Sequence, residues 1–172
     1  LIRGATVYDG SGEKEWVGDV CIAQGKIVEA GKAKDQAARV IDGHGLALMP
    51  GIVDVHTHYD AQLTWDRTLS PSPALGVTTA VMGNCGFGIA PCPAPQRQTV
   101  LRNLSVVEGM DLAALEAGVR WEAESFGDYL GQLQRIGPYA NVAVLAQHST
   151  IRSAVMGDEA STRATPSAEQ MS

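Results

Sequence analysis

The sequence predicts an α/β fold in two parts, a small β-sandwich-like module at residues 1–50 and a parallel α/β unit at residues 51–172. Two observations lead to this division. Short apolar runs separated by glycine turns fill the first part, whereas strand-like and helix-like segments alternate after Pro50-Gly51. Because parallel strands need long crossover connections, the alternation favours either a doubly wound sheet or a (β/α)8 barrel.

The N-terminal module contains a predicted hairpin. Val20 and Ile22 alternate with small or polar neighbours, and Gln24-Gly25 separates them from the next apolar run. Glycine in a two-residue connection supplies the positive φ that a tight hairpin turn requires. A second glycine turn further along contains His44, which we expect to be a solvated loop residue.

The second part is expected to contain three strands joined by helices. The helices have apolar side chains at helical spacing, and the last of them starts with Ser-x-x-Asp and stops at Gly-Pro. The third strand is an uninterrupted apolar run, which indicates burial of both faces. A complete barrel needs ~250 residues, so we expect a fragment that holds about three of the eight units. The expected strands are residues 52–58, 77–82 and 141–146, and the expected helices are residues 96–108, 111–117 and 125–136.

The composition argues against several functional classes. The 13 basic and 19 acidic residues give a net charge of −6, whereas nucleic-acid surfaces need clustered Lys and Arg. No apolar run approaches the ~20 residues of a membrane span, and we expect no membrane partner. Three cysteines form a poor disulfide framework, and no leader-like segment is seen, so a reducing, cytoplasmic location is expected.

The strongest chemical signal is a His-x-His pair at the end of the first strand of the second part. In a regular strand Asp54, His56 and His58 share one face, because alternate residues point the same way. Parallel α/β folds place their sites at the carboxyl ends of strands. Two imidazoles at positions i and i+2 can converge on one metal ion, so His56 and His58 are candidate ligands.

Cys85 follows the second strand and is the third candidate ligand, since it would lie at the same rim as the two histidines. A soft thiolate together with imidazole nitrogen favours Zn²⁺ over Mg²⁺ or Ca²⁺. The alternatives for Cys85 are a buried thiol in a glycine-rich turn or a disulfide to Cys92.

Other polar residues are candidates for supporting roles. His148 ends the third strand and could be a ligand, a substrate contact or a hydrogen-bonded neighbour of a ligand. Asp54 could orient the imidazole of His56, or it could make only a local turn hydrogen bond. Asp60 and Asp66 are interpreted as structural.

Several stretches resemble a known family. Residues 50–58 resemble the first barrel strand of the amidohydrolase superfamily, and the preceding fifty residues resemble its small N-terminal β domain. The resemblance is closer to the N-acyl-D-amino-acid deacylases, or D-aminoacylases, and covers nearly the whole chain. The similar segments are residues 56–62, 69–73, 76–79, 82–92, 121–129 and 147–152.

This resemblance implies a site and a reaction. His56 and His58 match the family's first-strand metal ligands, and Cys85 matches its thiolate ligand, with one tight zinc site and a second weaker site possible. The implied reaction is hydrolysis of the amide bond of an N-acyl-D-amino acid by zinc-activated water, which releases a carboxylate and a D-amino acid. The remaining ligands and the general base are expected beyond residue 172, so no catalytic residue is assigned within this sequence.

Two alternatives stay open. A cyclic amidohydrolase of the dihydroorotase or hydantoinase type would share the fold, although such enzymes usually present a lysine where this sequence has Cys85. A non-catalytic zinc-binding fragment is the second alternative, because three units cannot close a barrel. We expect the segment alone to be inactive and prone to aggregation through its open sheet edge.

Overall fold

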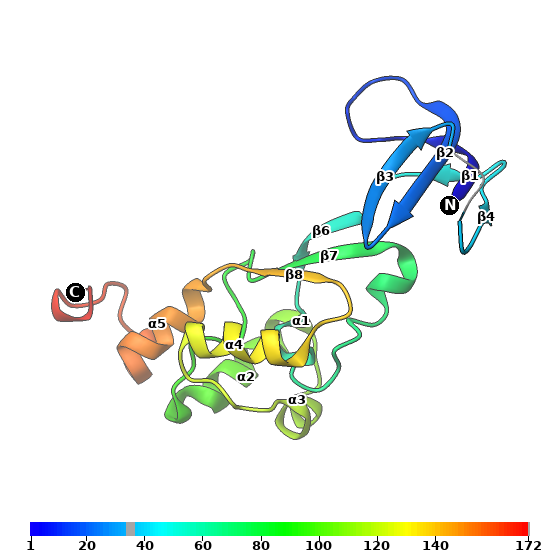
Figure 1. Cartoon of the computed structure of the whole chain (residues 1–172). Helices are drawn as coiled ribbons and strands as arrows, with labels where there is room; N and C mark the ends of the chain where they lie inside the picture. The colour runs from blue at the N-terminus through cyan, green and yellow to red at the C-terminus, as the bar shows by residue number, and fades with distance from the viewer. Residues whose placement is uncertain (34–36, 172) are drawn as a thin grey trace. The chain divides into compact units, whose positions relative to one another are not determined.

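The computed structural model describes residues 1–33 and 37–171, which form two compact units, Leu1–Gly51 and Ile52–Ser172 (Figure 1). Together they confirm the predicted fold class, since a β-rich unit precedes one that contains a parallel sheet and helices. No helix in the described ranges is both long enough and apolar enough to cross a membrane.

The first unit is a five-stranded sheet whose hairpin confirms the sequence prediction. Its strands β2 and β3 pair antiparallel, and the two residues between them, Gln24 and Gly25, have φ values of 50° and 73°. Positive φ at both central positions is the turn geometry that matches the twist of paired strands. The strands are β1 (Ile2–Val7), β2 (Trp16–Ala23), β3 (Lys26–Gly31), β4 (Ile41–Asp42) and β5 (Ala47–Leu48), in the order β3-β2-β1-β4 with β5 also paired with β1.

The strands β4 and β5 both pair parallel with β1. The turn between them fits closely, because a Cβ added to Gly43 would lie 2.9 Å from the side chain of Ala5. His44 is exposed, and its Nδ1 lies 2.6 Å from Oδ1 of Asp42. The expectation of a solvated loop histidine is therefore confirmed.

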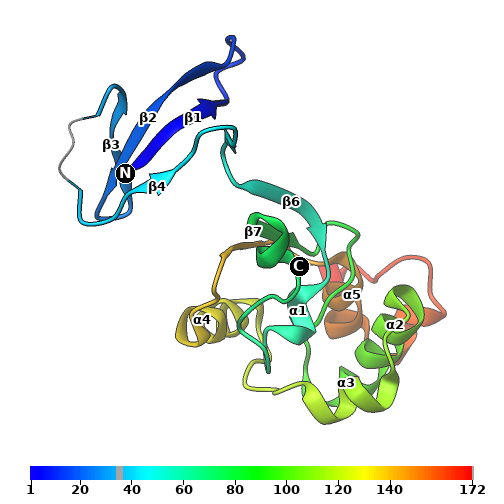
Figure 2. The same cartoon turned by 90° about the vertical axis from the view of Figure 1, so that its right-hand side faces the viewer.

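The second unit is a three-stranded parallel sheet in the order β6-β7-β8, with helices in the connections. Figures 1 and 2 show α2, α3 and α4 together on one side of this sheet. The strands are β6 (Ile52–Thr57), β7 (Val77–Met82) and β8 (Asn141–Val144). The helices are α1 (Tyr59–Gln62), α2 (Arg97–Glu108), α3 (Leu112–Gly118), α4 (Phe126–Ile136) and α5 (His148–Met156), with 3₁₀ turns at Ser72–Leu75, Ala94–Gln96, Gly157–Ser161 and Glu169–Met171.

Local sequence signals set the helix ends. Ser125 and Asp128 form a reciprocal capping box at the start of α4, and Asp111 caps α3 by accepting a hydrogen bond from the Ala114 amide. Gly137, at φ 61°, ends α4 in the left-handed conformation that favours glycine. The buried faces of the helices meet one side of β7 in a single core that includes Ala80, Met82, Leu101, Leu104, Leu115, Tyr129 and Leu133.

Burial of both faces of the third strand was predicted wrongly. The strand β8 ends at Val144, two residues early, and Val142 and Val144 are only half-buried. On the other edge strand, Val53 and Val55 are 55% and 59% exposed. The reason is that β6 and β8 are the edges of a three-stranded sheet whose helices cover one side.

A β-bulge interrupts β6 between Asp54 and Thr57, where the His-x-His pair begins. Ala80 and Met82, two residues apart on β7, pair with Asp54 and Thr57, which are three residues apart on β6. One extra residue therefore lies in β6, and strict alternation of side chains fails there. The prediction that Asp54 and His56 share a face of a regular strand is wrong for this reason.

Candidate metal centre

The structure brings His56, His58 and Cys85 together. One ligand atom from each residue lies within 4.8 Å of the other two. The sulfur of Cys85 is 3.8 Å from Nε2 of His58 and 4.0 Å from Nδ1 of the same ring, and the two imidazole centroids are 5.3 Å apart. His56 is exposed and the other two side chains are half-buried, so a donor set of two nitrogens and one sulfur faces accessible space.

The spacing between the sulfur of Cys85 and Nε2 of His58 fits two ligands of one tetrahedral metal ion. With Zn–S near 2.3 Å and Zn–N near 2.05 Å, a sulfur and a nitrogen bound to one ion lie about 3.6 Å apart. The observed 3.8 Å between Cys85 and His58 is close to that value. Mixed sulfur and nitrogen donors favour zinc, so these residues fit the metal that the sequence predicted.

The alternative disulfide between Cys85 and Cys92 is wrong, because both thiols are free. Cys92 is instead 1% exposed within the core, where burial raises the pKa of its thiol to about 11. Cys85 accepts a hydrogen bond at 3.4 Å from the backbone N–H of Phe87. The thiolate is the form of cysteine that binds metals.

The loop that carries Cys85 is held by contacts on both sides. Asn84 donates from Nδ2 to the carbonyl of Val55 at 3.0 Å, which ties the loop to the bulged region of β6. Gly83 has φ 83°, and a Cβ there would lie 2.6 Å from the carbonyl oxygen of Leu145. The Gly-Asn-Cys sequence therefore places the thiol next to the histidine pair.

A buried polar pair lies beneath this region. Gln147 is 0% exposed; its Nε2 donates to Oδ1 of Asp60 at 2.5 Å, and its Oε1 accepts from the backbone N–H of Ala90 at 3.2 Å. Tyr129 donates its hydroxyl to the main-chain carbonyl of Asp60 at 2.9 Å. These bonds join the segments that follow β6, β7 and β8, and they agree with the structural role predicted for Asp60.

The carboxyl group of Asp60 is in an unusual environment. Its Oδ2 is buried and has no hydrogen-bond partner within residues 1–33 and 37–171. Burial raises the pKa of Asp60 from 3.8 to about 7, opposed by the bond from Gln147, while the nearby charge of Glu108 adds to the increase. The importance of Gln147 was missed in the sequence, because a glutamine after an apolar run gives no signal of a partner 87 positions away.

The structure also places an unpredicted carboxylate beside a ligand histidine. Nδ1 of His58 lies 3.0 Å from Oε1 of Glu108, and the two side chains are 21% and 15% exposed. Glu108 was expected only as the last residue of a helix, and fifty positions separate it from His58, so no spacing rule identifies the contact.

Two predicted supporting residues lie outside the ligand cluster. Asp54 accepts a hydrogen bond at 3.2 Å from the backbone N–H of His56, which is the local turn bond considered as its alternative role. His148 is the exposed first residue of α5 and packs near Gly86. Asp66 accepts bonds from the amide and hydroxyl of Thr68, and these bonds lower its pKa, as suits a turn residue.

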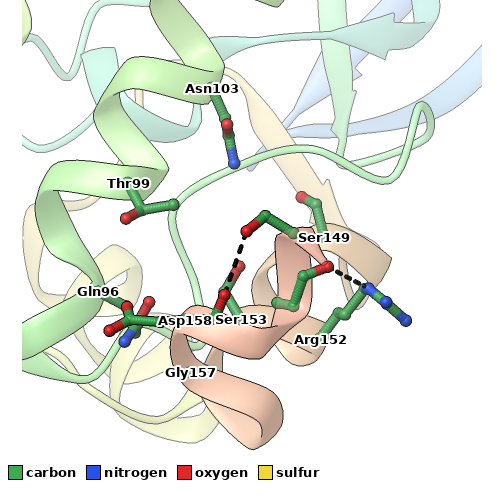
Figure 3. Close-up of a pocket in the computed structure, with 10 residues that line it drawn as sticks. Gln96, Thr99, Asn103, Ser149, Arg152, Ser153, Gly157 and Asp158 are labelled. Carbon is green, nitrogen blue, oxygen red and sulfur yellow. Dashed lines mark hydrogen bonds between the residues drawn. The ribbon is translucent and has the colours of Figure 1, made fainter. Parts of the chain in front are cut away.

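A separate hollow of about 320 Å³ lies between α2 and α5 (Figure 3). Polar side chains line it, including Thr99, Asn103 and Ser153, and none of the three candidate ligands does. Arg152 at its wall donates from Nε to the carbonyl of Ala160 at 2.9 Å, so its guanidinium is occupied by the main chain.

The chain belongs to the amidohydrolase family, whose family model matches residues 39–172. It is 36% identical over 159 residues to a D-aminoacylase of Alcaligenes xylosoxydans xylosoxydans, an alignment that covers 92% of this chain and 31% of that protein. The chain therefore spans about a third of the length of the curated relatives that it matches.

Solved structures of deacylases are also similar to this chain. D-Aminoacylase structures, one of them from a study of that enzyme's binuclear metal centre, match with a TM-score of 0.78 and 34% identity. They cover 99% of this chain, which covers 33% of theirs. The N-acyl-D-glutamate deacylase of Bordetella bronchiseptica, solved with zinc and a phosphonate inhibitor, matches with a TM-score of 0.72 and 29% identity, covering 98% of this chain and 33% of that one.

Proposed function

We propose that the protein carrying this sequence is a zinc-dependent hydrolase that cleaves the amide bond of N-acyl-D-amino acids. The convergence of His56, His58 and Cys85 at the ends of two neighbouring parallel strands is the observation that carries the proposal. The similarity to D-aminoacylases supports the substrate class. In this proposal residues 1–50 are the N-terminal part of a small β domain, and residues 51–172 are the first units of a barrel.

In this proposal three residues of this chain bind the metal. His56 and His58 would contribute imidazole nitrogens, and Cys85 a sulfur that accepts a hydrogen bond from the amide of Phe87. A bound zinc ion would polarise the acyl carbonyl and lower the pKa of a water molecule from ~15.7 toward ~7. The general base and the other ligands are assigned to the remainder of the protein, and a second, weaker metal site is part of the proposal.

The charge and the thiols support the rest of the assignment. A net charge of −6 suits a small-molecule substrate better than a nucleic-acid partner. Cys21, Cys85 and Cys92 are all free, which supports a reducing, cytoplasmic location. The thiol at position 85 favours a deacylase over a cyclic amidohydrolase, for which a lysine is expected at the corresponding position.

The test is an assay of the protein that carries this sequence, loaded with zinc, on N-acetyl-D-methionine, N-acetyl-L-methionine and hydantoin. We expect release of D-methionine and no opening of hydantoin. Cys85→Ser should remove both bound zinc and activity, whereas Cys21→Ser, a matched change at a free thiol on β2, should preserve both.

Either half of the proposal can fail separately. Hydrolysis of hydantoin without release of D-methionine would reject the proposed substrate. A zinc content that Cys85→Ser leaves unchanged would reject the proposed site.

A further inference from the structure

We propose that Glu108 is a positioning residue for this metal centre: its carboxylate accepts the Nδ1 proton of His58 and so presents Nε2 of that ring to the ion. The inference rests on the proposed function, because it requires that the cluster bind a metal. It adds a residue that the ligand set does not contain and that no motif in the sequence indicated.

The two nitrogens of His58 are not distinguished by their distances to the thiol. Nε2 is 3.8 Å and Nδ1 is 4.0 Å from the sulfur of Cys85, so either could share an ion with it. The carboxylate of Glu108 distinguishes the two nitrogens, because its Oε1 lies 3.0 Å from Nδ1. A neutral imidazole carries one proton, and a bond from Nδ1–H to a carboxylate leaves the lone pair of Nε2 for the metal.

The position of Glu108 in its helix argues for a specific role. It is the last residue of α2, where the carbonyl ends of the helix carry partial negative charge and a carboxylate is unfavourable. The side chain is only 15% exposed. Among the described residues, no Lys or Arg forms an ion pair with it. Burial of a carboxylate at this end of a helix is expected only where a hydrogen-bond donor compensates for it, and His58 is that donor.

The helix also fixes where this carboxylate lies. Val100, Leu101 and Leu104 anchor α2 in the core that contains Met82 of β7. Gly109, at φ 65°, ends the helix directly after Glu108. A carboxylate on a packed helix can hold an imidazole in one orientation, which a side chain on a mobile loop cannot do.

The central experiment records the tautomer of His58 in the zinc-free protein, by two-bond ¹H–¹⁵N NMR spectra with assignment through His58→Gln. We expect His58 to carry its proton on Nδ1, and Glu108→Ala to move the ring to the Nε2–H form that dominates in free histidine side chains. Zinc affinity, measured by competition with a chelator, should fall ~10–100-fold in Glu108→Ala. A loss of this size is typical when the hydrogen-bond partner of a metal-binding histidine is removed.

Two further variants control the experiment. Glu116→Ala removes the same side chain from an exposed position on α3 and should change neither the tautomer nor the affinity. Glu108→Gln keeps an acceptor oxygen without the charge, so the Nδ1–H form should persist while zinc affinity falls several-fold. If Glu108→Ala does not fold, the inference depends on Glu108→Gln, and an affinity equal to that of the wild type would overturn it.

The failure of this inference differs from the failure of the proposed function. An unchanged His58 tautomer in folded Glu108→Ala would overturn the positioning role, even if wild-type protein still binds zinc. A wild-type protein that binds no zinc would overturn the proposed function, and this inference with it.

Discussion

Two polar clusters lie at the carboxyl ends of the parallel strands, and they are built in opposite ways. Asp60 and Gln147 are buried and bond to each other and to the main chain. His56, His58 and Cys85 are exposed or half-buried, and their ligand atoms lie within 4.8 Å of one another. The first cluster joins loops and the second offers ligands, and this difference in role goes with a difference in burial.

The largest expected effect is a loss of stability with rising pH that depends on Asp60. Its folded-state pKa of about 7 lies above the unfolded value of 3.8, so the folded protein binds the proton more tightly. The contribution of Asp60 to stability is therefore fully present below pH 4, falls as the pH rises toward 7 and levels off above it, by at most about 4 kcal/mol. Urea unfolding of the wild type and of Asp60→Asn across this range measures the effect.

In Asp60→Asn the loss of stability that results from the titration of Asp60 should disappear. Asp66→Asn provides the control, because the exposed Asp66 has its pKa lowered by bonds to Thr68 and not raised by burial. Equal slopes of stability against pH in wild type and Asp60→Asn would show that Asp60 is not the titrating group.

The next effect tests the packing around Gln147. A Cβ added to Gly88 would lie 2.2 Å from the amide carbon of Gln147, which is bonded on both sides and cannot move away. We expect Gly88→Ala to lower the free energy of unfolding by about 2–3 kcal/mol. Gly127→Ala in α4, where the nearest atom would be 3.8 Å away, should be neutral or slightly stabilising. Similar denaturation midpoints for the two variants would contradict this account.

Thiol reactivity separates the buried core, which contains Cys92, from the ligand cluster, which contains Cys85. Because burial raises the pKa of Cys92 to about 11 from 9.0, its thiolate fraction near pH 8 should be about 100-fold below that of an ordinary thiol. Iodoacetamide labelling followed by mass spectrometry should therefore modify Cys85 well before Cys92, and added zinc should slow only Cys85. Labelling of Cys92 at the same rate would place it outside the core.

The smallest expected effect concerns His148. It lies at the exposed start of α5 and outside the ligand group found among the described residues. His148→Ala should change zinc affinity less than ~2-fold, in contrast to the ~10–100-fold loss expected for an outer partner of a metal histidine. A loss as large as that of Glu108→Ala, measured by the same chelator competition, would make His148 part of the site.

Features set by neighbouring residues were predictable from the sequence, and features set by distant contacts were not. The capping box of Ser125, the turn at Gln24-Gly25 and the proximity of Cys85 to the histidines all follow from local chemistry and strand order. The bulge in β6 could not be predicted, because an extra residue in one strand appears only when the register of its neighbour is known. The contact of Glu108 with His58 arises from tertiary packing of α2 and has no local signature.

The hydrogen bond from Asn84 to the carbonyl of Val55 affects the entropy change of metal binding. It couples the strand that bears the imidazoles to the turn that bears the sulfur, so the three donors are arranged before any cation arrives. Since little conformational freedom then remains to be lost on coordination, binding should have a smaller entropic penalty than it would with unlinked segments.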